Sequence, residues 1–250
     1  MNRIVADLGN SRLKWGRVTP DGRLAEVVSL PTDDPAAWLE AWNGWGLDGD
    51  ASWSIASVNP PLAAHLADFL AGRGVAEPRW FRSARDVAIR HEIEHAETAG
   101  ADRALAVAGA MTLAPAGCPG LVVSCGTAVT VERVAADGTW QGGAIAPGLG
   151  PMARALRVMT AQLPEVAPVE APEPWGRSTR PALEAGVFWG VVGAIRELVA
   201  RQSAGLADPW LFWTGGDAPR FASYIVRDGS RVVPHLVLEG LIRQAPYPIP

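Results

Sequence analysis

The sequence contains little cysteine. Only Cys118 and Cys125 occur among its 250 residues. Two cysteines cannot build a disulfide framework, and they do not supply the four or so closely spaced ligands of a structural zinc site. A chain with so few cysteines is typical of a reducing compartment, so we expect a cytoplasmic location.

The sequence also lacks a long apolar run and a strong excess of charge of either sign. Its longest apolar stretch, residues 186–195, is far shorter than the roughly 20 residues that a membrane span needs. No signal-peptide pattern precedes the first apolar segment at Ile4. The formal net charge is −4, and basic residues are scattered. We therefore expect neither a membrane nor a nucleic acid as partner, whereas a small anionic ligand is compatible with this composition.

The composition is that of a soluble globular protein, with 48% hydrophobic and 19% charged residues. Eleven tryptophans are present, and Trp38, Trp42 and Trp45 recur at helical spacing, which predicts the buried face of a helix. The turn-rich segment 114–120 is the candidate domain boundary. We expect an N-terminal domain over residues 1–114 and a C-terminal domain over 115–250.

The most informative feature is a pattern that occurs twice, at residues 4–11 and again at 121–128. In each copy an apolar run leads to a small polar or acidic residue, one spacer, a glycine and a hydroxyl-bearing turn. A buried strand that ends in such a turn presents backbone N–H groups and hydroxyls to the phosphates of a nucleotide. The repeat therefore predicts a phosphotransferase built from two related halves.

The expected secondary structure follows the same repeat. Each half begins with a three-stranded meander, over residues 2–30 in the first half and 120–146 in the second. Helices follow each meander, the last of them over roughly residues 236–243. A further strand is expected at 51–57 in the first half and another at 211–213 in the second. This order is the one expected of two actin-like (ribonuclease H-like) α/β domains with a nucleotide cleft between them.

Six short motifs now carry a family resemblance over the whole chain. They begin at Asp7, Gly100, Gly126, Gly142, Gly176 and Thr214, and read DLGNS, GADR, GTAVT, GGAIAPG, GRST and TGGD. In this order and spacing the chain resembles type III pantothenate kinases of the acetate-and-sugar-kinase/actin superfamily. The resemblance implies ATP-dependent phosphorylation of pantothenate to 4′-phosphopantothenate, the first step of coenzyme A biosynthesis. It also implies ATP, Mg²⁺ and a monovalent cation (K⁺ or NH₄⁺) as cofactors, and a homodimer.

The resemblance assigns the phosphate-binding residues to the strand-end turns. Asp7 would hold Mg²⁺ directly or through its waters, since hard cations prefer carboxylate oxygens. The alternative for Asp7 is a turn-initiating aspartate, and Lys14 could equally be a solvent-facing strand residue. The residues expected to contact ATP are Asp7, Gly9, Asn10, Ser11, Lys14, Gly126, Thr127, Ala128, Gly215 and Gly216, the last two beside the adenosine.

Asp102 is the candidate general base toward the primary hydroxyl of pantothenate, because an aspartate is ionised at pH 7 and can accept that proton. The alternative is an acid that only offsets a helix dipole. The remaining candidates for substrate binding are Gly100, Ala101, Arg103 and Thr179. Arg103 could pair with the substrate carboxylate or with a neighbouring acid, and Thr179 could instead be a simple N-cap.

The sequence departs from the family pattern in its second phosphate motif and in the segment before GADR. Ser124 stands where the second phosphate motif usually begins with aspartate, and Glu132 stands where its far end usually has aspartate. A serine hydroxyl is a weaker ligand for a hard cation than a carboxylate, so Ser124 is a degenerate position for the monovalent cation. The Tyr and Pro that usually precede GADR are also missing. An active kinase is the leading hypothesis; the alternatives are a silent nucleotide-binding regulatory protein and a kinase for another small molecule.

Overall fold

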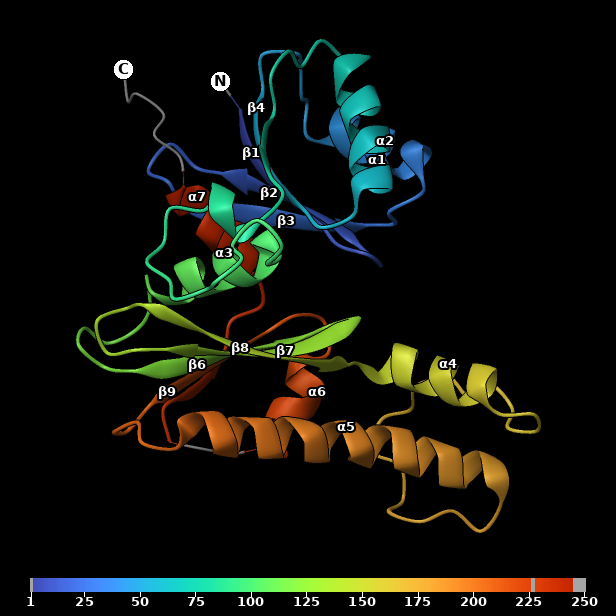
Figure 1. Cartoon of the computed structure of the whole chain (residues 1–250). Coiled ribbons are helices and arrows are strands. Elements are labelled where there is room, and N and C mark those ends of the chain that lie inside the picture. Colours follow the sequence, from blue (N-terminus) through green and yellow to red (C-terminus); the bar gives the residue numbers. More distant parts are fainter. Residues whose placement is uncertain (1, 226–227, 245–250) are drawn as a thin grey trace. The chain divides into compact units, whose positions relative to one another are not determined.

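The structure is a computed structural model that describes residues 2–225 and 228–244 (Figure 1). The chain forms two compact units. Unit 1 comprises Met1–Leu113 and His235–Pro250, and unit 2 comprises Ala114–Pro234. Each unit contains one five-stranded sheet. Among the described residues, no helix has the length and apolar character needed to cross a bilayer.

The sheet of unit 1 has the strand order β3-β2-β1-β4-β5. The meander strands pair antiparallel, while β4 and β5 join the other side of β1 as parallel strands. The strands are β1 (Arg3–Leu8), β2 (Leu13–Val18), β3 (Leu24–Leu30), β4 (Ser52–Ser57) and β5 (Arg79–Phe81). The carboxyl end of the central strand β1 is therefore flanked by β2 and β4.

The sheet of unit 2 has the order β10-β9-β6-β7-β8. Read from β8 to β10, this order repeats that of unit 1 strand for strand. Its strands are β6 (Gly120–Cys125), β7 (Ala128–Val134), β8 (Trp140–Pro147), β9 (Trp210–Thr214) and β10 (Ser230–Val232). Here too the meander is antiparallel, and β9 and β10 are parallel additions beside β6. The predicted duplication is thus confirmed at the level of topology.

The core of unit 1 lies on the face of the sheet covered by α1 (Pro35–Gly44) and α2 (Pro60–Ala71). Both helices have Pro at their start and a side-chain N-cap, from Asp34 and Asn59. Trp38 and Trp42 are buried, and the Trp42 ring stacks on Trp53 with centroids 6.2 Å apart. The predicted role of the tryptophan stripe in core packing is confirmed.

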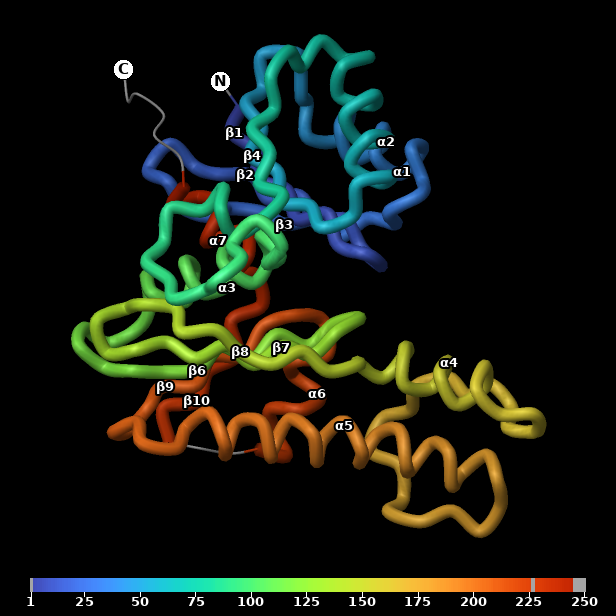
Figure 2. The backbone as a smooth tube through the Cα atoms, viewed as in Figure 1, coloured from blue at the N-terminus to red at the C-terminus, as the bar shows by residue number. Residues whose placement is uncertain are grey.

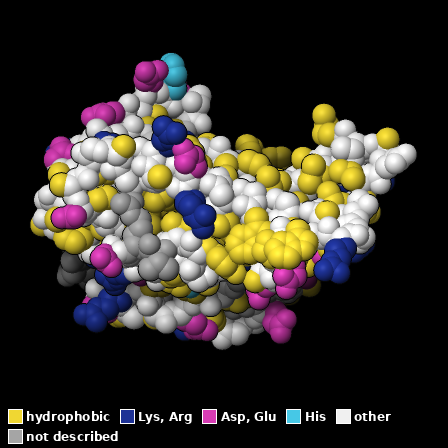
Figure 3. Space-filling model, turned by 90° about the horizontal axis from the view of Figure 1, so that it is seen from below, with side chains coloured by type: hydrophobic (Ala, Val, Ile, Leu, Met, Phe, Trp, Pro, Cys, Tyr) yellow, Lys and Arg dark blue, Asp and Glu magenta, His cyan; other side chains and the backbone are white. Residues whose placement is uncertain are grey.

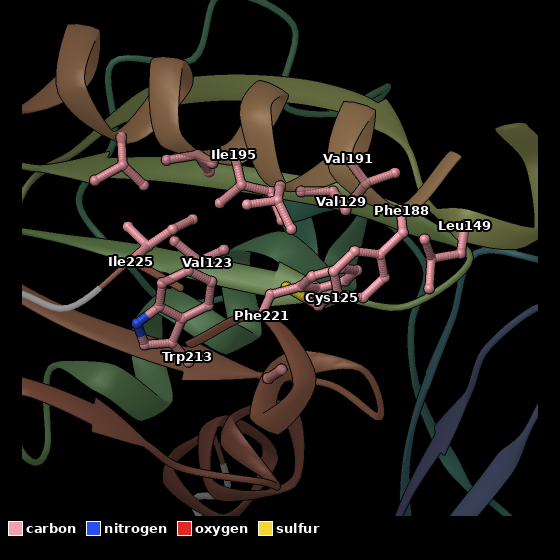
Figure 4. Packing of buried hydrophobic residues seen from close by; sticks show 14 of the residues in the cluster. Val123, Cys125, Val129, Leu149, Phe188, Val191, Ile195, Trp213, Phe221 and Ile225 are labelled. Atoms are coloured by element: carbon pink, nitrogen blue, oxygen red, sulfur yellow. The ribbon is translucent and has the colours of Figure 1, made fainter. Parts of the chain in front are cut away.

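The core of unit 2 lies between its sheet and the long helix α5 (Thr179–Ser203), which runs along one face of the sheet in Figure 2. Phe188, Val191 and Ile195 of α5 face Val123 and other sheet residues (Figure 4). Helices α4 (Leu149–Met159) and α6 (Ala218–Ala222) complete the unit. Neither α6 nor β10 was predicted, because elements of five and three residues have no readable period.

The other face of the unit 1 sheet carries α3 (Ala101–Ala110) and α7 (Leu236–Arg243), after a 3-10 turn at Ala84–Asp86. The two helices pack through reciprocal glycines. A Cβ at Gly109 would overlap the carbonyl oxygen of Leu236, and one at Gly240 would overlap that of Leu105. This close backbone contact places α7 in unit 1, whereas the sequence expectation had assigned residues 235–250 to the second domain.

Candidate functional site

The first phosphate turn joins β1 to β2 in unit 1. The Gly9 N–H donates to the Arg12 carbonyl at 3.1 Å and closes the turn. Asn10 and Ser11 are exposed at its tip, and Asn10 Oδ1 accepts from Asn59 Nδ2 at 3.0 Å. The N-cap of α2 thus holds the turn in place, and the tip presents polar side chains outward.

Asp7 lies immediately before this turn and is paired in register with Lys14 of β2. Ile4, Ala6 and Leu8 face the tryptophan core, so alternation along the strand puts Asp7 on the opposite face. Asp7 is half-buried, and this burial raises the pKa of its carboxyl to about 6. Lys14 opposes that rise in pKa and the charge of Asp102 adds to it, which places three charged groups close together.

Lys14 is the single lysine among the 22 basic residues of the chain. An ammonium group is a compact point charge that suits a phosphate oxygen, whereas arginine offers a planar fork. His235, which begins α7, also lies near Lys14: burial lowers the pKa of the imidazole, and Lys14 lowers it further. Sequence reasoning missed His235, because it lies more than 200 residues from the turn that it approaches.

Asp102 lies in the first turn of α3, whose N-cap position is Gly100. Its Oδ1 accepts from the Arg103 backbone N–H at 2.9 Å. A Cβ at Gly100 would overlap Asp102 Oδ1 and press on Val58, so the glycine leaves room for the carboxylate. Ala101 is fully buried beneath. The GADR motif therefore presents one half-buried carboxylate, that of Asp102, close to Asp7.

The second phosphate turn joins β6 to β7 in unit 2. Gly126, Thr127 and Ala128 are exposed, and the Gly126 N–H donates to the Ala128 carbonyl at 3.0 Å. The Gly148 N–H donates to the Thr127 carbonyl at 3.0 Å, and a Cβ at Gly148 would overlap the Gly126 carbonyl oxygen. The glycine-rich segment after β8 therefore supports the turn from behind.

The TGGD segment after β9 reaches the same turn. Gly215 has φ +92, and a Cβ there would overlap the backbone of Cys125. The Asp217 N–H donates to the Cys125 carbonyl at 3.1 Å. Gly216, by contrast, faces open space. Only glycine fits at position 215, both for its backbone conformation and for its contact with β6.

A cavity of about 360 Å³ opens beside Gly216 in unit 2. Arg220 at its wall pairs with Asp217 Oδ1 at 3.1 Å and with Glu170 Oε1 at 3.2 Å. Burial raises the pKa of Asp217, and Arg220 opposes that rise. The other lining residues are Ala171, Pro219, Ser223 and Tyr224. This cavity could not be predicted from the sequence, because most of its wall belongs to the unpredicted helix α6 and the residues after it.

Thr179 is the first residue of α5 and is exposed, while Ser178 occupies the N-cap position. The alternative that Thr179 is a simple N-cap is therefore wrong. A Cβ at Gly176 would overlap the start of α5 near Ala182, so the preceding segment lies against the helix. Among the residues that the structure describes, no cluster of three or more His, Cys, Asp or Glu side chains could hold a metal ion.

Comparison with solved structures supports the fold. A candidate 2-dehydro-3-deoxygalactonokinase from Sinorhizobium meliloti aligns with TM-score 0.61 and 15% identity, covering 97% of both chains. A candidate Baf family transcriptional activator from Campylobacter jejuni aligns with TM-score 0.60 and 19% identity, covering 96% of both. At such identities the likeness shows the fold alone, and it confirms the predicted actin-like α/β class.

Sequence comparison identifies the family. The sequence model of type III pantothenate kinase matches residues 3–201. Proteins named type III pantothenate kinase include one from Synechococcus elongatus, 32% identical over 98% of this chain and 97% of its own length. Another, from Aromatoleum aromaticum, is 36% identical over 95% of both chains. The chain therefore belongs to the type III pantothenate kinase family.

Proposed function

We propose that this chain is a pantothenate kinase, which transfers the γ-phosphoryl group of ATP to the primary hydroxyl of pantothenate. The observation that carries the proposal is the group Asp7, Lys14 and Asp102 in unit 1, where three charged side chains meet at the end of β1. Family membership supplies the substrate pair. No finding favours the non-catalytic alternative.

In the proposed reaction the pantothenate oxygen forms a bond to the γ-phosphorus, the bond to the β-phosphate oxygen breaks, and ADP leaves. Asp102 takes the proton of the attacking hydroxyl. Lys14 neutralises charge on the phosphates. The turn at 9–11 in unit 1 and the turn at 126–128 in unit 2 are each proposed to contact phosphate through backbone N–H groups. Such positioning and charge stabilisation make up most of the catalysis of phosphoryl transfer. Arg103 and Thr179 are proposed to bind pantothenate, Arg103 through its carboxylate.

Asp7 fits the Mg²⁺ that the family implies. Its carboxylate is half-buried and has a raised pKa, so Lys14 alone does not offset the cost of burying its charge. A divalent cation would supply the missing positive charge, and carboxylate oxygen is its preferred ligand. Bound Mg²⁺ would neutralise phosphate charge during transfer.

The cavity beside Gly216 is proposed to receive the adenosine of ATP. Gly216 has no side chain to block the entrance of the cavity. The wall of the cavity contains the aromatic ring of Tyr224 and the guanidinium of Arg220. Planar groups of this kind suit a nucleobase, because every base has a face on which they stack. Gly215, which precedes Gly216 in the chain, lies against the backbone of Cys125, the last residue of β6 before the β6–β7 turn.

The proposal is tested by release of ADP from Mg-ATP with and without pantothenate. We expect release that depends on pantothenate, and a product with the mass of 4′-phosphopantothenate. A panel of sugars and hydroxy acids serves as the control for substrate class. Strong preference for another acceptor would replace pantothenate in the proposal, and binding of ATP without any transfer would support a silent protein.

The single lysine offers a direct test of phosphate contact. An amine-reactive acylating reagent can modify only Lys14 and the terminal amine, and peptide mass spectrometry separates the two. We expect Mg-ATP to slow acylation of Lys14 by about tenfold or more at saturation, while the terminal amine is unaffected. Equal rates with and without nucleotide would remove Lys14 from the proposed phosphate contacts and favour the solvent-facing alternative.

A homodimer in the cytoplasm is part of the proposal. In unit 2 an apolar hollow lies between α4 and α5, lined by residues that include Met152, Leu156, Met159 and Val187. Met159 is 81% exposed, and Figure 3 shows hydrophobic side chains gathered on the side where α5 lies. A second copy of the chain would cover such a surface. Sedimentation should give twice the 26.4 kDa of the chain, and a mass of one chain would contradict the dimer.

A further inference from the structure

Three hydroxyl side chains form a row across the sheet of unit 2. Ser124 at the end of β6 is in register with Thr130 of β7 on one side and with Thr214 of β9 on the other. Register partners share a face of a sheet, with neighbouring strands about 4.8 Å apart. The neighbours Val123 and Cys125 of Ser124 face the core of Figure 4, so this hydroxyl row lies on the opposite face.

Two of the three equivalent positions in unit 1 are charged. Asp7 there is in register with Lys14 on one side and with Ala56 on the other. The topological repeat makes Asp7 the counterpart of Ser124, and Lys14 the counterpart of Thr130. One unit therefore offers an acid and a base at the end of its central strand, whereas the other offers three uncharged hydroxyls.

The hydroxyl row does not fit a monovalent cation site built on a carboxylate. Two carboxylates lie near it in unit 2, and both have other partners. Glu132 is fully buried and accepts from Trp140 Nε1 at 3.0 Å, and its Oε2 lies against Gly143 of β8. Asp217 pairs with Arg220. Neither replaces the negative charge that aspartate would supply at position 124.

The hydroxyl row does fit an acceptor oxygen. Thr130 is only 8% exposed, and its Oγ1 has no hydrogen-bond partner among the described residues. A buried hydroxyl has a hydrogen to donate, and leaving it unpaired costs free energy. A bound cation would occupy only a lone pair of that oxygen and leave the hydrogen unpaired, whereas a phosphate oxygen would accept it.

We propose that the hydroxyl row Thr130–Ser124–Thr214 binds a phosphate oxygen of the nucleotide directly, and that this chain needs neither K⁺ nor NH₄⁺. The inference rests on the proposed kinase function. It assigns the phosphate contact of unit 2 to neutral hydrogen-bond donors, and it leaves cation chemistry to unit 1, around Asp7 and Lys14.

The first experiment compares sodium, potassium, ammonium and choline chloride at equal ionic strength in the ADP-release assay. We expect rates that agree within about twofold, and equal affinities for ADP by calorimetry in choline and potassium. A rate at least tenfold higher in potassium or ammonium would overturn the inference. No release in any salt, with ADP still bound equally tightly in choline and potassium, would end the kinase proposal while supporting this one.

Two variants of Ser124 isolate the charge. Ser124→Asp is expected to weaken ADP binding at least tenfold in choline, because the new carboxylate repels phosphate. Added potassium should restore much of the lost affinity for ADP. Ser124→Asn has the same size as the aspartate without the charge and is expected to show no response to potassium. The inference would be contradicted if neither variant bound ADP more tightly in potassium. It would also be contradicted if potassium strengthened ADP binding by the asparagine variant.

Thr130→Val tests the unpartnered hydroxyl itself, since valine keeps the shape and removes Oγ1. We expect ADP to bind about fivefold to tenfold more weakly, with the melting temperature of the free protein unchanged or raised. Weaker binding with retained stability would support direct contact with phosphate. Unchanged binding by a folded variant would show that the row does not touch the nucleotide, and would overturn the inference.

Discussion

Asp102→Asn is expected to lower pantothenate-dependent turnover by about two to four orders of magnitude while leaving the fold intact. General-base catalysis by a positioned side chain contributes an effect of that size. The asparagine keeps an oxygen that can accept from the Arg103 N–H, so the start of α3 retains its hydrogen bond. The variant loses the negative charge of the carboxylate, and with it the ability to take the proton of the attacking hydroxyl.

The alternative role of Asp102, as an acid that offsets the helix dipole, predicts a different result. An exposed charge in the first turn is worth about 0.3–1 kcal/mol of stability and nothing in the chemical step. Asp68→Asn, at an exposed position of α2, is the matched control for loss of one helix carboxylate in the same unit. Undiminished turnover in Asp102→Asn, with stability lowered in that variant, would rule out the proposed base.

The sheets could be predicted from the sequence because their signals are local. Pro20-Asp21-Gly22 and Asp137-Gly138 mark the meander turns, and the apolar runs before Asp7 and Ser124 mark the central strands. Asp7, Lys14 and Asp102 were found in the same way, since each belongs to a short motif whose residues lie near it in the chain.

The remaining features depend on contacts between distant segments. Helix α7 was recognised as a helix, but its place in unit 1 depends on the reciprocal contacts of Gly109 and Gly240, which no local pattern reveals. The position of His235 near Lys14 was missed for the same reason, because the two residues are far apart in the chain. The hydroxyl row also escaped prediction, because Ser124 meets Thr214 only through the register of β6 with β9, strands separated by two helices.

Lowering the pH through 6 is expected to weaken binding of a Mg²⁺–nucleotide analogue by about tenfold per pH unit, with constant affinity above about pH 7. The pKa of Asp7 is raised to about 6 in the free protein, so the carboxyl is protonated below that pH. A metal ligand must be deprotonated, and binding then releases the proton. Calorimetry from pH 5 to 8 measures the slope.

The stability of the free fold should respond to Asp7 in the opposite direction. Because its folded pKa lies above the ordinary value of 3.8, the native state binds the proton more readily than the unfolded chain does. The contribution of Asp7 to stability is therefore fully present below about pH 4 and is lost as the pH rises through 6. Urea titrations without nucleotide should show this contribution as a difference between wild type and Asp7→Asn across that range.

Asp7→Asn should abolish the pH dependence and weaken binding of the Mg²⁺–nucleotide at pH 8 by roughly 100-fold, because it removes the carboxylate that is proposed to hold the metal. Asp68→Asn again serves as the control and should retain the wild-type slope. Asp102→Asn should move the midpoint to lower pH, since the charge of Asp102 helps to raise the pKa of Asp7. A wild-type affinity that is constant from pH 5 to 8 would contradict the placement of the metal at Asp7, and an unmoved midpoint in Asp102→Asn would show that the two carboxylates do not interact.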